Sequence, residues 1–83
     1  MHWHLKPQAL KNLKRLPKEA QQQIIIKLDF YTNTKNPLQF AKRMQKSSLG
    51  DYRFRVGDYR IIFDLEKDSL VVLVIGNRKN IYR

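Results

Sequence analysis

The 83-residue sequence contains no cysteine, which excludes a disulfide framework, a thiolate zinc site and a cysteine nucleophile. No apolar run approaches the roughly 18 residues of a membrane span. The first residues, MHWHLKPQ, lack the basic start and the apolar stretch of a signal peptide. We therefore expect a soluble, cytoplasmic protein with no membrane partner. The length predicts one domain over residues 1–83, because domains usually take about 100 to 200 residues.

Acidic residues are few relative to basic ones. Seven Asp and Glu stand against seventeen Lys and Arg, which gives a formal net charge of +10. Such an excess costs self-repulsion, and it makes a polyanion such as a nucleic acid or a nucleoprotein the first partner to consider. The alternative is a basic surface that is simply well solvated. The excess lies mostly in residues 1–50, which carry ten basic and two acidic side chains.

Two amphipathic patterns in the first half predict a helical hairpin. Apolar residues recur at three- and four-residue spacing within residues 7–16, which predicts a short helix. Pro17 suits the first turn of a second helix, because an N–H there has no partner in any case. A second apolar stripe runs from Ala20 to Tyr31, and polar residues then end the helix at 31–33. The inner stripes of this pair need a third surface to cover them.

From residue 51 onward the hydrophobic period changes from about 3.6 to 2, which predicts β-strands. The dipeptide Gly57-Asp58 has the Gly-X form of a type II′ hairpin turn, and this turn sets Arg55 directly opposite Arg60. The resulting register places Arg53, Arg55 and Arg60 on one face. A one-residue slip would turn these arginines into the core, so the register is strongly constrained. The other face is the predicted core face and collects Tyr52, Phe54, Val56, Tyr59, Ile61, Phe63 and Leu65.

The remaining segments complete a small α+β fold. Residues 70–75 are apolar throughout, as expected for a strand that is buried on both faces. Residues 3–5 are a candidate for a further strand, and residues 34–50 are expected to form an irregular connection. We expect a small antiparallel sheet of three to four strands with the N-terminal helical hairpin packed on one face.

The opposed arginines of the hairpin are the strongest sign of a functional site. Like charges directly opposite each other on neighbouring strands destabilise a sheet by a few tenths to about 1 kcal/mol, so selection for stability alone would avoid them. If the third strand runs antiparallel to the second, Arg78 arrives near Arg55 and Arg60 at the turn. Tyr82 then follows within reach. Guanidinium groups that converge on one sheet face form a site for phosphate, because each presents a planar fork of donors. A solvated basic strand face is the alternative.

Several segments together carry a resemblance to a known family: LKPQALKNLKRLPKEAQQQI, NPL, GDYRFRVGDYRIIFDL, VVLVIGNR and the terminal IYR. Over nearly the whole chain the sequence resembles a toxin of the RelE/ParE superfamily from bacterial type II toxin–antitoxin systems, closer to the RelE branch. The most specific part is YRFRVGDYRII. The resemblance implies a small antiparallel sheet with two helices on one face. It also implies a ribosome-dependent endoribonuclease, an mRNA interferase that cuts mRNA in the decoding site.

The resemblance further implies that Arg53, Arg55, Arg60, Arg78 and Tyr82 occupy the positions of the catalytic basic residues and tyrosine. Cleavage of RNA through its own 2′-hydroxyl needs a base, a cationic group at the phosphorane and an acid for the departing 5′-oxygen. Arginine suits the second role, but its pKa above about 12 makes it a poor base. We expect Arg55 and Arg60 to stabilise the phosphate. We expect Arg78 on the leaving-group side and Tyr82 to orient or stack a base. Some relatives have lysine where Arg53 and Arg55 stand, which leaves the general base open.

The expected partners follow from the basic charge of the chain and from the family resemblance. Ribosomal RNA phosphates attract basic side chains with salt-sensitive affinity and no sequence choice. The resemblance implies a cognate antitoxin, the ribosome and mRNA as partners, with a monomeric free toxin and a hetero-oligomer with antitoxin. No cofactor or metal is expected, since His2 and His4 lack further ligands. Two other functions stay open: a ParE-like inhibitor of DNA gyrase and a non-enzymatic basic module that binds RNA or DNA. The candidate RNA- and ribosome-binding residues are Lys11, Lys14, Arg15, Lys42, Arg43 and Lys46.

Overall fold

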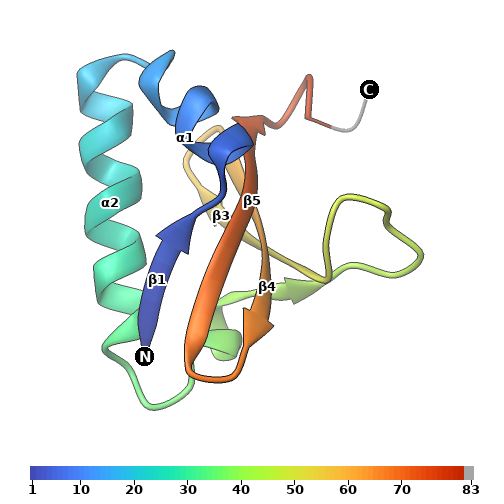
Figure 1. Cartoon of the computed structure of the whole chain (residues 1–83). Helices are drawn as coiled ribbons and strands as arrows, with labels where there is room; N and C mark the ends of the chain where they lie inside the picture. Colours follow the sequence, from blue (N-terminus) through green and yellow to red (C-terminus); the bar gives the residue numbers. More distant parts are fainter. Residues whose placement is uncertain (82–83) are drawn as a thin grey trace.

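Figure 1 shows a computed structural model of the chain, which describes residues 1–81. Within these residues no helix is long and apolar enough to cross a membrane. The elements follow one another as β1 His2–Leu5, α1 Pro7–Lys14, α2 Lys18–Thr32, the 3₁₀ helix η1 Pro37–Phe40, β2 Lys42–Arg43, β3 Tyr52–Val56, β4 Tyr59–Glu66 and β5 Ser69–Asn77.

The two helices form where the apolar spacing predicts them. Helix α1 begins at Pro7, whose missing N–H costs nothing in a first turn. It ends at Lys14 rather than at residue 16, because the Leu16 N–H donates to the Leu13 carbonyl (3.1 Å) in a tightened last turn. The Gln21 side chain then donates to the Leu16 carbonyl (2.8 Å). This bond fixes the start of α2 against the end of α1.

The sheet has the strand order β1-β5-β4-β3-β2. Strand β1 runs parallel to β5, and the other three pairs are antiparallel. The α+β class is confirmed, but the sheet has five strands rather than three to four and is mixed rather than antiparallel. Strand β2 lies in the segment predicted to be irregular, where Lys42 pairs with Arg53 and Arg43 pairs with Tyr52. Two residues are too few to show a period, so the sequence pattern gave no sign of this strand.

The hairpin of β3 and β4 has the predicted register. Arg55 lies opposite Arg60, and Val56 lies opposite Tyr59. Gly57 has a φ of +57°, the left-handed conformation that the first central position of a type II′ turn requires. Strand β5 runs antiparallel to β4 and places Gly76 opposite Arg60, as expected.

Both helices cover one face of the sheet, and the hydrophobic core lies between the helices and the sheet (Figure 1). Helix α1 contributes Leu13 to this core, and α2 contributes Ile24 and Leu28. We call the opposite side the outer face; it carries the arginines of β3 and β4. The seven side chains of the predicted core face all lie in the core or pack against it, namely Tyr52, Phe54, Val56, Tyr59, Ile61, Phe63 and Leu65.

The connection between β2 and β3 loops out beyond the outer face (Figure 1). Near its end, Gly50 returns to the sheet so closely that a Cβ there would lie 2.7 Å from the Ile62 side chain and 2.9 Å from that of Leu73. The Asp51 N–H donates to the Asp64 carboxylate (2.7 Å) beside this contact. The connection is therefore anchored on the outer face just before β3 begins.

Candidate nucleic-acid interface

A hollow of about 260 Å³ lies at the β2–β3 edge of the outer face. Its lining consists of Phe40, Lys42, Arg53 and Arg55, and we call it the basic hollow. Arg53 and Arg55 share a face because they are two residues apart on β3. Lys42 joins them because it lies opposite Arg53 in the β2–β3 register. The structure thus brings together two of the five predicted catalytic residues and one predicted RNA-binding lysine.

The basic hollow is bordered by like-charged pairs. Lys42 opposes Arg53, and Arg55 opposes Arg60. Each such pair costs a few tenths to about 1 kcal/mol of sheet stability. Among the described residues, no acidic side chain lines the hollow. A concave surface lined by one sign of charge concentrates its electrostatic field, so this site attracts anions.

Arg60 is buried, with 5% of its surface exposed. Its Nη1 donates to the carbonyls of Gly57 (3.2 Å) and Tyr59 (3.0 Å). Next to it, Ile81 packs over Gly76 so closely that a Cβ on this glycine would lie 3.2 Å from the Ile81 Cβ. The predicted strand position of Arg60 is confirmed. Its guanidinium, however, braces the hairpin turn and does not line the basic hollow.

Arg78 lies at the hairpin turn, as the antiparallel third strand predicts. Its N–H donates to the Asp58 carbonyl (2.8 Å). Its Nε lies 3.7 Å from the Asp58 carboxylate, and the two side chains are 54% and 71% exposed. Such an exposed pair contributes little and is screened by salt. Arg78 therefore presents its charge to solvent beside the turn, outside the lining of the basic hollow. Tyr82 lies outside the described residues.

The other basic candidates are dispersed. Lys11, Lys14 and Arg15 lie on α1 or directly after it, and α1 covers the core face of the sheet. Arg43 points to the opposite side from Lys42, and its guanidinium carbon lies 5.9 Å from the centre of the Tyr52 ring. Lys46 is exposed in the connection that follows β2. The five residues that do not line the basic hollow are Lys11, Lys14, Arg15, Arg43 and Lys46.

Phe40 is a lining residue that sequence reasoning missed. It is 40% exposed, and its ring stacks on that of Tyr31 with centroids 4.9 Å apart and planes 24° apart. Burial raises the pKa of Tyr31 above its ordinary value of 10.0, so the supporting ring stays neutral. The available signal was an aromatic residue two positions before a Lys-Arg pair, in QFAKR. Aromatic rings beside basic side chains are typical of surfaces that bind single-stranded nucleic acid.

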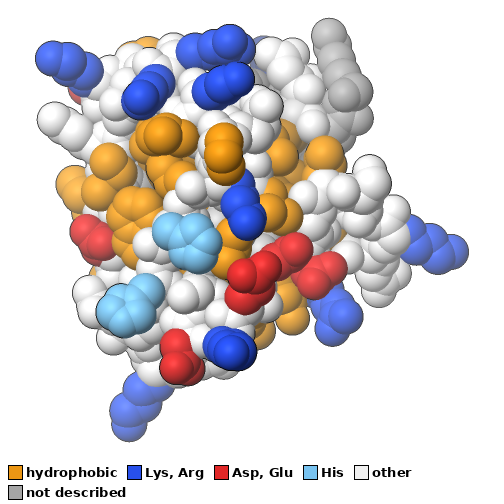
Figure 2. Space-filling view, in the orientation of Figure 1, with side chains coloured by type: hydrophobic (Ala, Val, Ile, Leu, Met, Phe, Trp, Pro, Cys, Tyr) orange, Lys and Arg blue, Asp and Glu red, His pale blue; other side chains and the backbone are white. Residues whose placement is uncertain are grey.

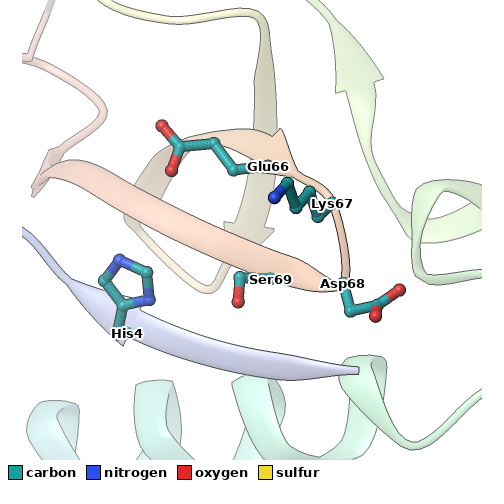
Figure 3. Close-up of a pocket in the computed structure, with 5 residues that line it drawn as sticks. All are labelled: His4, Glu66, Lys67, Asp68 and Ser69. Carbon is teal, nitrogen blue, oxygen red and sulfur yellow. The ribbon is translucent and has the colours of Figure 1, made fainter.

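A second, larger hollow of about 680 Å³ lies around the β4–β5 turn and is lined by His4, Glu66, Lys67, Asp68 and Ser69. Figure 3 shows that the carboxylates of Glu66 and Asp68 point in opposite directions. No three His, Asp or Glu side chains of residues 1–81 come together as a metal site. Acidic side chains gather near the middle of the face shown in Figure 2, while most Lys and Arg lie around its rim. This hollow is therefore not a second anion site.

The arrangement of two helices on one face of a small mixed sheet is also found in solved structures of toxin–antitoxin complexes, including the following three. The RelBE2 toxin–antitoxin complex of Mycobacterium tuberculosis matches with a TM-score of 0.75 and 20% identity, over 93% of this chain and 96% of that chain. The RelE–RelB complex of Pyrococcus horikoshii OT3 matches with a TM-score of 0.74 and 24% identity, over 95% of this chain and 96% of that chain. The intact RelBE complex of E. coli matches with a TM-score of 0.72 and 15% identity, over 92% of this chain and 94% of that chain. At these identities the likeness is one of fold.

The sequence itself gives the family. The family model for the ParE toxin of the type II toxin-antitoxin system, parDE, matches residues 4–82. The chain belongs to this family and is the toxin of a type II toxin–antitoxin system. A comparison with curated proteins finds no match. The resemblance to the RelE/ParE superfamily, inferred from segments over nearly the whole chain, is confirmed.

Proposed function

We propose that this toxin is a ribosome-dependent endoribonuclease that cuts mRNA in the decoding site and so inhibits translation. The observation that carries the proposal is the basic hollow, where three cationic side chains and an exposed aromatic ring meet on one concave surface. A surface built only for protein docking has no need of two like-charged pairs that weaken the sheet. The shared fold with RelE toxins supports the proposal by analogy.

The proposed reaction uses the 2′-hydroxyl of the RNA. The 2′-oxygen bonds to phosphorus while the bond from phosphorus to the 5′-oxygen breaks, which leaves a 2′,3′-cyclic phosphate and a 5′-hydroxyl. Water takes the proton from the 2′-hydroxyl and returns one to the 5′-oxygen. Arg53 and Arg55 donate to the phosphoryl oxygens as negative charge develops on them, and Lys42 adds a further charge. Because arginine is a poor base, alignment of the 2′-hydroxyl by the ribosome supplies the rest of the acceleration.

The remaining predicted catalytic residues take separate parts in this proposal. Arg60 braces the turn and so holds Arg55 in position, and its positive charge lies behind the phosphate site. Arg78, exposed beside the turn, acts on the leaving-group side. Tyr82 orients or stacks a base of the substrate.

We propose that a cognate antitoxin neutralises the toxin by covering the basic hollow in a hetero-oligomer, and that the free toxin is a monomer. An acidic, amphipathic segment complements a chain with a net charge of +10. The matched RelE structures are complexes with RelB antitoxins, which supports a partner of this kind. Such a cover excludes RNA from the site.

The test is primer-extension mapping of a defined mRNA incubated with the purified protein, with and without translating ribosomes. We expect cuts only with ribosomes and only in the decoding-site codon. Arg55→Ala should slow cleavage by about 10²- to 10³-fold, the usual effect of removing one donor to a developing negative charge, while ribosome binding persists. Lys18→Ala is the matched control, because Lys18 is an exposed cation at the start of α2. Intact mRNA in the presence of ribosomes would overturn the proposal.

A second candidate function is inhibition of DNA gyrase, which is supported by the match to the ParE family. A supercoiling assay with purified gyrase tests it. Inhibition that survives Arg55→Ala, together with intact mRNA, would replace the nuclease proposal.

A further inference from the structure

The ring of Phe40 is the one part of the basic hollow that phosphate chemistry does not use. We propose that the hollow is a binding subsite for a nucleotide, in which Phe40 stacks on a base and the neighbouring cations hold the phosphate. This inference rests on the proposed nuclease function and extends it, because it adds a substrate-positioning residue and a ligand class, a single-stranded nucleotide. Aromatic side chains bind bases in this way whatever the sequence, since every base has a π-face.

The Phe40 ring is held in place from behind. It stacks on Tyr31, which is itself buried and lies 4.3 Å from Phe54, centroid to centroid. Phe54 stacks in turn on Phe63 at 4.3 Å. Phe30 flanks the Phe40 ring at 5.7 Å. A column of rings from the core thus fixes the orientation of an exposed ring, and a ring fixed before binding loses little entropy when a base stacks on it.

The backbone between Phe40 and Lys42 holds the Phe40 ring and the Lys42 cation near each other. Asn36 caps η1 by accepting a bond from the Leu38 N–H (3.2 Å), and the Ala41 N–H donates to the Leu38 carbonyl (3.0 Å). After Ala41, in extended conformation, comes Lys42. The Cα atoms of Phe40 and Lys42 are therefore about 7 Å apart. Both side chains line the basic hollow, so the ring and the cation are available to one ligand.

The charges around Phe40 favour a nucleotide over a protein segment. Phe30 and Ile26 of α2 are also exposed, at 53% and 65%, so Phe40 could instead belong to an apolar protein-docking surface. Every other lining residue of the hollow is cationic: Lys42, Arg53 and Arg55. An aromatic ring with phosphate-binding cations beside it is complementary to a nucleotide, because a nucleotide joins an aromatic base to an anionic phosphate.

The experiment uses a short single-stranded RNA that contains 2-aminopurine and 2′-O-methyl groups, so that it fluoresces and cannot be cleaved. Stacking quenches 2-aminopurine, and titration with the toxin at low salt gives the affinity. We expect quenching by the wild type and by Phe40→Tyr. Phe40→Leu keeps an apolar contact with Tyr31 but loses the π-face, so it should bind about 5- to 150-fold more weakly. Ile26→Ala is the control, because Ile26 is an exposed apolar residue that neither lines the hollow nor belongs to the column of rings. Circular dichroism and thermal melting of each variant confirm the fold.

Ribosome-dependent cleavage and antitoxin binding of the same variants separate the outcomes. If the wild type quenches through Phe40 but does not cut mRNA, the nuclease proposal fails and the nucleotide subsite stands. If the wild type cuts mRNA and Phe40→Leu matches it in quenching and cleavage, the subsite is overturned. A Phe40→Leu variant that loses only antitoxin affinity also overturns it and assigns Phe40 to a protein-docking surface.

Discussion

Replacing Arg55 with threonine should make the toxin more stable and, at the same time, much less active. Arg55 is exposed on β3 and lies directly opposite Arg60, which is buried. The substitution removes a like-charged cross-strand pair and introduces a β-branched residue that favours strands. Removal of such a pair should raise the free energy of unfolding by about 0.2 to 1 kcal/mol. For a chain of this length, that gain corresponds to an increase in Tm of roughly 1 to 8 °C.

The assay is thermal unfolding followed by circular dichroism, at low salt and again at 1 M salt. At 1 M the Debye length falls to about 3 Å, so the repulsion in the wild type is largely screened and the advantage of Arg55→Thr should shrink. Arg55→Lys keeps the charge and serves as the control, with no gain in stability expected. In the mRNA cleavage assay, Arg55→Thr should be slowed by about 10²- to 10³-fold, as expected for Arg55→Ala.

Two results would refute this reasoning. The first is an Arg55→Thr protein that is no more stable than the wild type at low salt, because the opposed arginines would then carry no energetic cost. The second is a gain that is undiminished at 1 M salt, because the gain would then come from strand propensity and not from charge.

Three further substitutions test other parts of the structure. Gly57→Ala should lower the free energy of unfolding by about 1 to 2 kcal/mol in urea denaturation, because φ is +57° and the site is otherwise open; a neutral result would contradict the assigned turn. Asp29→Ala removes the acceptor of the Trp3 Nε1 hydrogen bond (2.8 Å) and should cost about 0.5 to 1.5 kcal/mol, whereas Asp29→Asn should retain most of the stability; equal losses would argue against this bond. The raised pKa of Tyr31 means that the unfolded state ionises first, so stability should be complete below pH 10 and fall as the pH rises through the folded pKa; Tyr31→Phe should show a smaller fall in pH-dependent unfolding, and an identical fall would refute the assignment.

Much of the hairpin was predictable because its signals are local. The Gly57-Asp58 turn and the alternation on either side of it specify the same register, and both agree with the observed pairs. Strand β1 was a candidate from residues 3–5, but its parallel pairing with β5 was not predictable. That pairing joins His2 to Ser69, and no local pattern connects segments so far apart in the chain.

The candidate site was predicted only in part, because the sequence shows local patterns and does not show contacts between distant segments. Alternation along β3 places Arg53 and Arg55 on one face, and the structure brings them into one hollow. Arg60 is buried, although the alternation along β4 predicts only which face of the sheet it lies on and not how much of it is covered. Phe40 reaches the hollow through a short 3₁₀ helix, where neither a helical nor a strand period applies.

The parallel pairing of β1 with β5 also has a consequence for the order of events during synthesis. β1 ends at Leu5 and β5 begins at Ser69, 64 positions later. At translation rates of about 5 to 20 residues per second, β1 waits roughly 3 to 13 seconds for its partner strand to be made. Until then β4, which pairs with β3 at the basic hollow, lacks its other neighbouring strand. The five-stranded sheet can therefore be completed only after β5 is synthesised.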